Sequence, residues 1–509
     1  MKKYCALAFI GLLFGLWGLI TLVPPNMDEF IKYHRLACWA FEGSQYSVFQ
    51  EGCDKYSASI FGIPFHRNYQ YIGVLSNYLY APFYYLIPGV YSHYLFGLVS
   101  LLLFSFLLVR ALKVRWECIF IPLTFFPLLY LMIHDHGPAN FSLISYPIFF
   151  LLVQKLFSRD LGLKSFLVLA SGIAATVLVG LDEKVFYLYL IPQILILSFA
   201  IALYQDGSLF KRSEIPQALP LIIRRVFFLG LVILLVCAGF LFFIKTEGVN
   251  YFRYLVELKK IQSREAPIGF GDIYSFLIQF GSTPYTYPHR IFHLNEGYLR
   301  ISQIVFAPLL AIAAFTVWHY RNRAAVWVLL LSEVVLILTF FVTKNVWASH
   351  HFIFLQIPVI ILLIFFANVS EKKFLLVSGF LLINLVTNIY LLKNSAVQGH
   401  ARLSQNGIFE YLSQNEIAKN SLINFSSFGG YFILSLYGNK EQVVTWKDIK
   451  NTVSGNELIS LSKNASKKNI LNACEGCDLE LMKTAFPDSQ IQLVGPKDAT
   501  WRVWQIIPN

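Results

Sequence analysis

Runs of about twenty apolar residues recur along the chain between short charged clusters, and each run is long enough for a helix to cross roughly 30 Å of hydrocarbon. Hydrophobic residues make up 56% of the 509 residues and charged residues 14%, against about 25% charged residues in an average soluble protein. We therefore predict an α-helical polytopic membrane protein with about eleven transmembrane helices. The runs lie at residues 4–23, 90–112, 118–133, 140–157, 165–181, 186–204, 226–244, 301–318, 325–342, 352–368 and 374–392.

Basic residues between the runs predict the orientation. The net charge of +12 is spread over small clusters that fall in alternate loops, so it indicates topology and not a nucleic-acid partner. With the N-terminus in the cytoplasm, every cytoplasmic loop contains Lys or Arg. The residues are Lys113, Arg115, Arg159, Lys164, Lys211, Arg212, Arg224, Arg225, Arg321, Arg323, Lys372 and Lys373. The first run has no small-residue cleavage site before Pro24, so we interpret it as a retained span and not a signal peptide.

The chain divides into two predicted domains. Residues 1–392 form the transmembrane domain, with large outer loops at 24–89 and 245–300. Residues 393–509 are polar and contain short strand-like runs such as 442–446 and 501–507, which predict a small soluble α/β or α+β domain outside the cytoplasm.

Four of the seven cysteines fall on the predicted outer side. An even number there suits an oxidising compartment, so we predict the disulfides Cys38 to Cys53 and Cys474 to Cys477. A redox-active pair or half of a metal site are the alternatives for the C-x-x-C at 474.

An acidic pair, Asp28 and Glu29, follows the first run directly. Taken alone, the acidic pair is equally consistent with a solvated helix junction. The loop continues, however, without another span and ends in a stretch rich in Tyr and Pro at residues 69–85. This arrangement resembles the GT-C superfamily of membrane glycosyltransferases, of the protein O-mannosyltransferase and aminoarabinose transferase type. The resemblance covers the architecture of the whole chain, but motif identity is confined to the acidic pair and the aromatic stretch.

The resemblance implies an enzyme that moves a sugar from a polyprenyl-phosphate donor to a glycan, lipid or protein acceptor. It places the reaction on the outer face of a bacterial cytoplasmic membrane. Asp28 matches the family's catalytic carboxylate, the general base that deprotonates an acceptor hydroxyl. Glu29 would assist it or orient the acceptor.

Other polar residues gather on the same predicted side and are candidates for substrate binding. His134, Asp135 and His136 form the second outer loop, where contact with the donor phosphate and simple solvation are both favoured over a metal site. A divalent cation is thus left open, and no other cofactor is predicted. Asp182, Glu183 and Lys184 form the third outer junction, where substrate binding and mutual neutralisation are weighted equally. The remaining candidates are Arg290 and His350, cations that would stabilise the leaving phosphate.

Two other functions are alternatives. An O-antigen polymerase or ligase has a similar number of spans, but its long loop lies late in the chain and it lacks an acidic pair after the first span. A lipid-linked glycan transporter or flippase would carry paired broken helices and an internal repeat, and the sequence shows neither.

Overall fold

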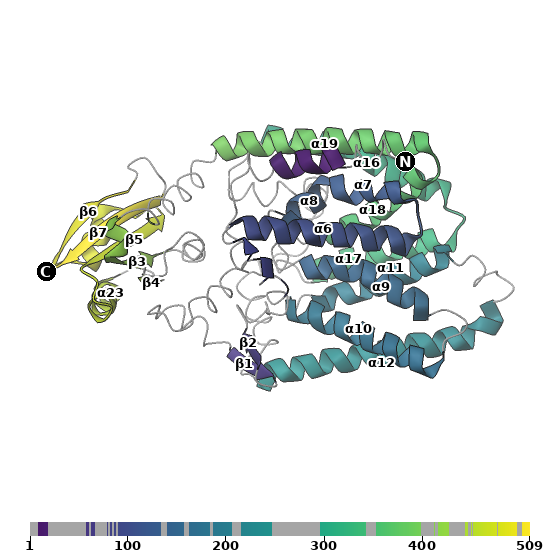
Figure 1. Cartoon of the computed structure of the whole chain (residues 1–509), viewed down its shortest axis with the longest axis horizontal. Coiled ribbons are helices and arrows are strands. Elements are labelled where there is room, and N and C mark those ends of the chain that lie inside the picture. Colours follow the sequence, from purple (N-terminus) through teal and green to yellow (C-terminus); the bar gives the residue numbers. More distant parts are fainter. Residues whose placement is uncertain are drawn as a thin grey trace.

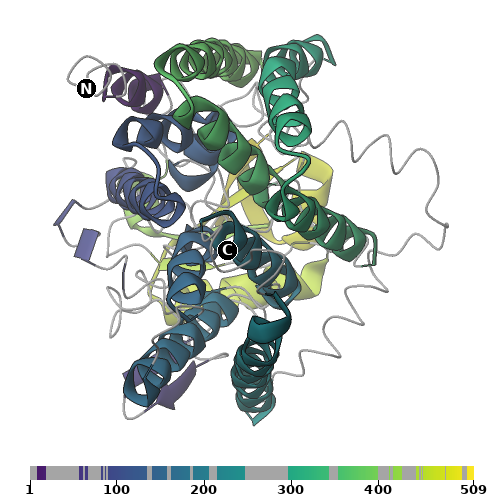
Figure 2. The same ribbon diagram turned by 90° about the vertical axis from the view of Figure 1, so that its right-hand side faces the viewer.

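The structure is a computed structural model that describes residues 9–18, 57–60, 63–66, 79, 82–83, 86–87, 90–133, 140–156, 162–183, 187–205, 215–246, 296–342, 353–398, 412, 416–426, 443–445, 449, 451–475, 477–495 and 501–509. Most of these residues belong to a bundle of apolar helices that run side by side (Figure 1). A five-stranded sheet lies beyond one end of the bundle (Figure 1). Viewed along the bundle, its strands lie behind the helices (Figure 2).

Each of the predicted apolar runs contains a described helix. The first is Phe9–Gly18. The others are α6 (Val90–Leu112), the group η1 (Trp116–Ile119), α7 (Phe120–Thr124) and α8 (Phe126–Ile133), then α9 (Asn140–Leu156), α10 (Leu163–Glu183), α11 (Tyr187–Gln205), α12 (Ile215–Thr246), α16 (Glu296–His319), α17 (Ala324–Val342), α18 (Ile353–Asn368) and α19 (Glu371–Gln398).

The length and composition of its helices indicate that the bundle is a membrane domain. Among the described helices, five are long and apolar enough to span a bilayer, and a sixth is counted if the bent pair in 116–133 is one span. Five more are apolar but shorter, between 10 and 17 residues. The mostly helical membrane fold is therefore confirmed, whereas the count of about eleven spans stays a prediction.

The run 118–133 differs from the single helix that was expected. It is broken at Phe125, whose ψ of 101° is extended, and the two halves meet at an angle of 70°. Pro127 explains the break, because it has no N–H to bond to the carbonyl of residue 123 and its ring clashes there.

Side chains from neighbouring helices cap the helix ends inside the bundle. At one end, Arg115 donates to the carbonyl of Ala367 in α18, Arg225 to that of Leu156 in α9, and Gln154 to that of Ala111 in α6. Terminal carbonyls have no partner within their own helix, and cations suit the negative end of the helix dipole. These bonds join helices that are not consecutive in the chain, where hydrocarbon would otherwise leave polar groups unsatisfied.

The first helix packs closely against α19 and the α7–α8 pair through a face of glycines (Figure 2). A Cβ atom on Gly15 would lie 2.8 Å from the Leu129 side chain, and one on Gly18 would lie 2.7 Å from Ile389. Small residues at this spacing let helix backbones approach in a membrane.

The C-terminal part is an α/β unit. Strands β3 (Ser421–Phe425), β4 (Val443–Thr445), β5 (Asn469–Glu475), β6 (Ser489–Leu493) and β7 (Trp501–Pro508) form one sheet in the order β4-β3-β5-β7-β6. β4, β3 and β5 are parallel, and β7 and β6 are antiparallel to their neighbours. Helices α23 (Thr452–Asn464) and α24 (Leu479–Ala485) pack against each other and contribute to a separate apolar core.

Two predicted strands, 442–446 and 501–507, correspond to β4 and β7. The predicted domain boundary at 392 falls inside α19, which continues to Gln398. In the first long loop, the structure describes a hairpin in which β1 (Ser57–Ile60) pairs with β2 (Ile63–His66).

Candidate functional site

Most of the predicted site residues lie outside the described part of the chain. These are Asp28, Glu29, Cys38, Cys53, His134, Asp135, His136, Lys184, Arg290 and His350. Of the predicted residues, the structure describes Asp182, Glu183, Cys474 and Cys477.

Glu183 and Asp182 are fully buried at the end of α10. The Glu183 carboxyl accepts hydrogen bonds from the backbone N–H groups of Phe141 at 3.0 Å and Ser142 at 2.6 Å, and from the Ser142 hydroxyl at 3.2 Å. The first N–H groups of a helix have no intrahelical partner, and a carboxylate is favoured at that positive end. Glu183 therefore caps α9, a role that the sequence did not indicate.

Polar contacts extend this cap to the start of α11. The Ser145 hydroxyl donates to the Ser142 carbonyl and accepts from the Tyr187 hydroxyl at 2.8 Å. The Tyr187 ring lies against Gly180, where a Cβ atom would come within 2.6 Å of it. The end of α10 and the starts of α9 and α11 are thus joined at one place. In sequence, the predicted second and third outer loops adjoin these helix ends.

A second buried network lies deeper in the bundle and was not predicted. Glu333 lies at the middle of α17 and accepts a hydrogen bond from Gln193 Nε2 at 3.2 Å. Gln193 Nε2 also donates to the Phe354 carbonyl at 3.1 Å, and Gln193 Oε1 accepts from the Tyr146 hydroxyl. The sequence does contain an indication of this network, a single acidic residue inside an apolar run. Placing such a side chain within a membrane costs free energy unless it has a polar partner.

Pro358 explains why Gln193 contacts a backbone carbonyl there. It lies inside α18, and a proline has no N–H for the carbonyl four residues earlier, which is that of Phe354. Gln193 supplies the missing donor. A carbonyl without a hydrogen-bond donor would be unfavourable in the hydrocarbon of a membrane.

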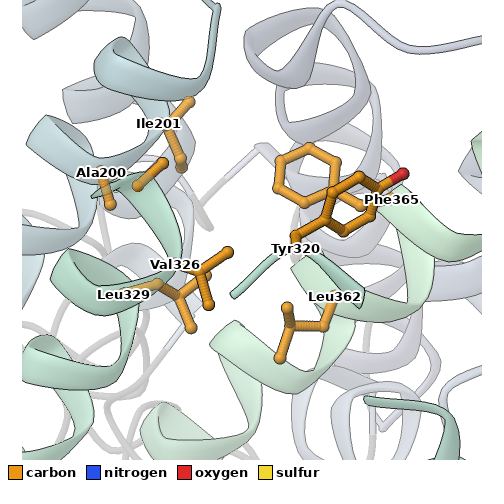
Figure 3. Close-up of a pocket in the computed structure, with 8 residues that line it drawn as sticks. Ala200, Ile201, Tyr320, Val326, Leu329, Leu362 and Phe365 are labelled. Atoms are coloured by element: carbon orange, nitrogen blue, oxygen red, sulfur yellow. The ribbon is translucent and has the colours of Figure 1, made fainter. Parts of the chain in front are cut away.

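A small apolar pocket opens between α11, α17 and α18 (Figure 3). It lies at the end of these helices that is remote from Glu183. Its lining residues are Ala200, Ile201, Tyr320, Ala325, Val326, Leu329, Leu362 and Phe365. No acid, base or nucleophile with catalytic character lines it, so we assign no chemistry to it.

In the C-terminal unit, a disulfide joins Cys474 and Cys477, whose Cα atoms are 5.8 Å apart. Both residues are buried in the apolar core. Arg502 donates to the Cys477 carbonyl at 3.0 Å. Burial favours a structural role over a redox role, because exchange requires access to a sulfur atom. Among the described residues, no group of three or more His, Cys, Asp or Glu side chains could hold a metal ion.

No protein-family model and no curated protein matches the sequence. Solved structures do match. ArnT from Cupriavidus metallidurans bound to undecaprenyl phosphate aligns over 99% of this chain and 97% of that chain, with 12% identity and a TM-score of 0.54. The same protein in the apo state aligns over the same shares with 11% identity and a TM-score of 0.53. An Archaeoglobus fulgidus oligosaccharyltransferase in complex with zinc and sulfate gives 10% identity and a TM-score of 0.43, covering 92% of this chain and 67% of that one. The chain thus has the fold of ArnT, a fold that the sequence analysis expected.

Proposed function

We propose that this protein is a membrane glycosyltransferase that moves a sugar from a polyprenyl-phosphate-linked donor to an acceptor on the outer face of the cytoplasmic membrane. The observation that carries the proposal is the match to the ArnT fold over almost the whole of both chains. The acidic pair Asp28 and Glu29, ten and eleven residues after the end of the first described helix at Gly18, supports it.

In the proposed reaction, Asp28 accepts the proton of an acceptor hydroxyl, whose oxygen attacks the anomeric carbon. The bond from that carbon to the phosphate oxygen breaks, and the lipid phosphate leaves with the bonding electrons. A hydroxyl is a poor nucleophile near neutral pH, so a positioned carboxylate supplies the acceleration. A single displacement inverts the anomeric configuration.

The leaving phosphate requires a cation to stabilise its developing charge, and Arg290 is our candidate because a guanidinium offers a fork of donors. His350, Glu29 and Lys184 are further candidates for contact with substrate. The bonds between Glu183 and the start of α9 support a common site for His134, Asp135, His136 and Asp182, because they join the helix ends that border these residues.

Asp28→Asn tests the proposal, since it keeps the size of the side chain and removes the proton acceptor. We expect turnover to fall by about 100-fold or more, with a much smaller change in donor affinity. Arg290→Ala should weaken donor binding as well as slow transfer, because a phosphate-binding cation acts in the ground state too.

The measurement is turnover of a lipid-linked sugar by purified protein, with donor binding measured separately. Asp488→Asn, at an exposed site in the C-terminal unit, is the matched control and should leave turnover unchanged. Near-normal turnover in Asp28→Asn would show that Asp28 is not the base. The polymerase or transporter function would then be favoured.

A further inference from the structure

The ends of α16 and α18 carry a connected chain of four aromatic rings. Phe315 and His319 lie near the end of α16, Tyr320 directly follows it, and Phe366 lies near the end of α18. The ring centroids are 4.8 Å apart for Tyr320 and His319, 6.0 Å for His319 and Phe315, and 6.0 Å for Phe315 and Phe366. We call these four rings the aromatic chain.

A cation lies at each end of the aromatic chain. The Arg323 guanidinium carbon is 5.3 Å from the centroid of the Tyr320 ring, and Lys373 Nζ is 4.9 Å from the centroid of the Phe366 ring. A cation within about 6 Å of an aromatic face is attracted by the electrons of the ring. The aromatic chain therefore holds two positive charges at defined places, one just before α17 and one in the first turn of α19.

The surroundings of these two cations are also basic. Residues 320–323 and 369–373, which include the turns α16–α17 and α18–α19, contain four Lys or Arg and one acidic residue, Glu371. Arg321 is exposed, and its guanidinium carbon lies 4.1 Å from the centroid of the Trp318 ring. Glu371 is exposed in the first turn of α19, where the helix dipole favours an acid. This end of the bundle therefore attracts an anion.

The apolar pocket between α11, α17 and α18 adjoins the aromatic chain (Figure 3). Tyr320 belongs to both, and Phe365, which lines the pocket, directly precedes Phe366. Ala325, also in the lining, comes two residues after Arg323. Among the described residues that line the pocket, only Tyr320 has a polar side-chain atom. Cations beside an apolar space suit a molecule with an anionic head and a hydrocarbon tail.

The place of this site in the membrane narrows the ligand to a phospholipid. The basic loops predict that this end of the bundle is cytoplasmic. The cytoplasmic leaflet carries anionic phospholipids, and basic pockets between transmembrane helices on that side bind their head groups. A free phosphate would leave the apolar pocket unused, and a zwitterionic lipid offers no net negative charge. A polyprenyl phosphate shares the chemistry, but the proposed reaction uses it at the opposite end of the bundle.

We infer that the ends of α16 and α18, with the starts of α17 and α19, bind one anionic phospholipid of the cytoplasmic leaflet. Arg321, Arg323 and Lys373 supply the positive charge for its head group, and the upper part of one acyl chain lies in the pocket. The site does not depend on the proposed function, because it lies at the end of the bundle opposite the proposed transfer.

The charge is tested with Arg323→Gln combined with Lys373→Gln in the purified full-length protein. Native mass spectrometry in detergent, during titration with phosphatidylglycerol, measures binding. We expect the double variant to bind about 30-fold more weakly, because each cation near the membrane surface adds to the attraction. The matched control is Lys155→Gln combined with Lys164→Gln, which removes two exposed charges from α9 and α10 at the same end. It should bind as the wild type does.

The pocket is tested with every charge in place. Ala325→Leu fills space that the acyl chain would occupy, so phosphatidylglycerol should bind about tenfold more weakly. Ala200→Val, in the α11 wall of the pocket, repeats this test if Ala325→Leu lowers the unfolding temperature. Glycerol phosphate, the head group without acyl chains, should displace no phosphatidylglycerol from the wild type. Displacement would instead show a site for free phosphate.

Three further results would overturn the inference. Equal binding of phosphatidylglycerol and phosphatidylcholine by the wild type would show that charge is not selected. An equal loss in the control with Lys155 and Lys164 substituted would show a general effect of charge at this end. Tighter binding of undecaprenyl phosphate than of phosphatidylglycerol, lost in the Arg323 and Lys373 variant, would assign the site to a polyprenyl carrier.

Loss of folding is separated from loss of binding by unfolding temperatures measured without added lipid. These temperatures should agree between the two double variants. If the Arg323 and Lys373 variant unfolds at a lower temperature, Arg323→Gln alone takes its place, with an expected loss in phosphatidylglycerol binding of about fivefold. Binding by Arg323→Gln equal to that of the wild type would then contradict the site.

Discussion

At the scale of single residues, Gln193 is the polar centre of the bundle. It is fully buried and bonds to side chains of α9 and α17 and to the backbone of α18. Gln193→Leu would leave the Tyr146 hydroxyl, the Glu333 carboxyl and the Phe354 carbonyl each without this partner. We expect a loss of about 3 kcal/mol in the free energy of unfolding, since an unsatisfied buried group costs about 1–3 kcal/mol. Unfolding in detergent, followed by circular dichroism, measures it.

Pro358→Ala provides a rescue. It restores the N–H that the Phe354 carbonyl lacks, so the cost of Gln193→Leu should be smaller by about 1 kcal/mol in the Pro358→Ala background. Pro308→Ala, at the proline inside α16, is the control and should give no rescue. Equal costs in all three backgrounds would show that Gln193 does not serve the Phe354 carbonyl.

The same residues show how far the sequence predicts a site. Glu333 could be singled out, because it is the lone acid of the run 325–342. Its partner could not, because Gln193 is 140 residues away and meets it only through helix packing. Glu183 was predicted to bind substrate or to neutralise its neighbours. Its contacts with the start of α9 depend on where that helix begins, which hydropathy does not resolve.

At the scale of elements, the close packing of the first helix on α19 depends on its glycines. Gly18→Leu would force the side chain into Ile389, so we expect a loss of about 1–3 kcal/mol in the free energy of unfolding, typical of overpacking. Gly379→Leu is the matched control in α19, because a Cβ atom there meets no atom within 4 Å. Unfolding of the two variants in the same detergent gives the comparison. Equal stability of the two variants would contradict the packing of the first helix on α19.

Helix positions were predictable because hydropathy alone locates apolar runs, and each run contains a helix. Helix ends were not. α12 begins at Ile215, well before the run at 226, because Arg224 and Arg225 interrupt the apolar run but are good helix formers. Strands β3, β5 and β6 are not among the predicted strands. β3 is buried at every position, and a short, fully buried strand has no distinctive period.

At the scale of the whole molecule, a resemblance carried by one acidic pair and one aromatic stretch predicted a fold that aligns with ArnT over 99% of the chain. This was possible because the order of spans and loops along the whole sequence also indicates the fold. The sequence does not predict that Asn424 and Asn472 lie side by side, because they come from strands that only the sheet order brings into register.

Orientation is the whole-molecule property from which every proposed site follows. The basic loops predict that one end of the bundle is cytoplasmic, and the caps formed by Arg115 and Arg225 lie at that end. Reporter fusions after Lys113, Lys211 and Lys372 should therefore report the cytoplasm. Fusions after Gly137 and after Gln398, where α19 ends, should report the outside. If two or more reporters are reversed, Asp28 and the C-terminal unit lie on the cytoplasmic side, and transfer on the outer face is excluded.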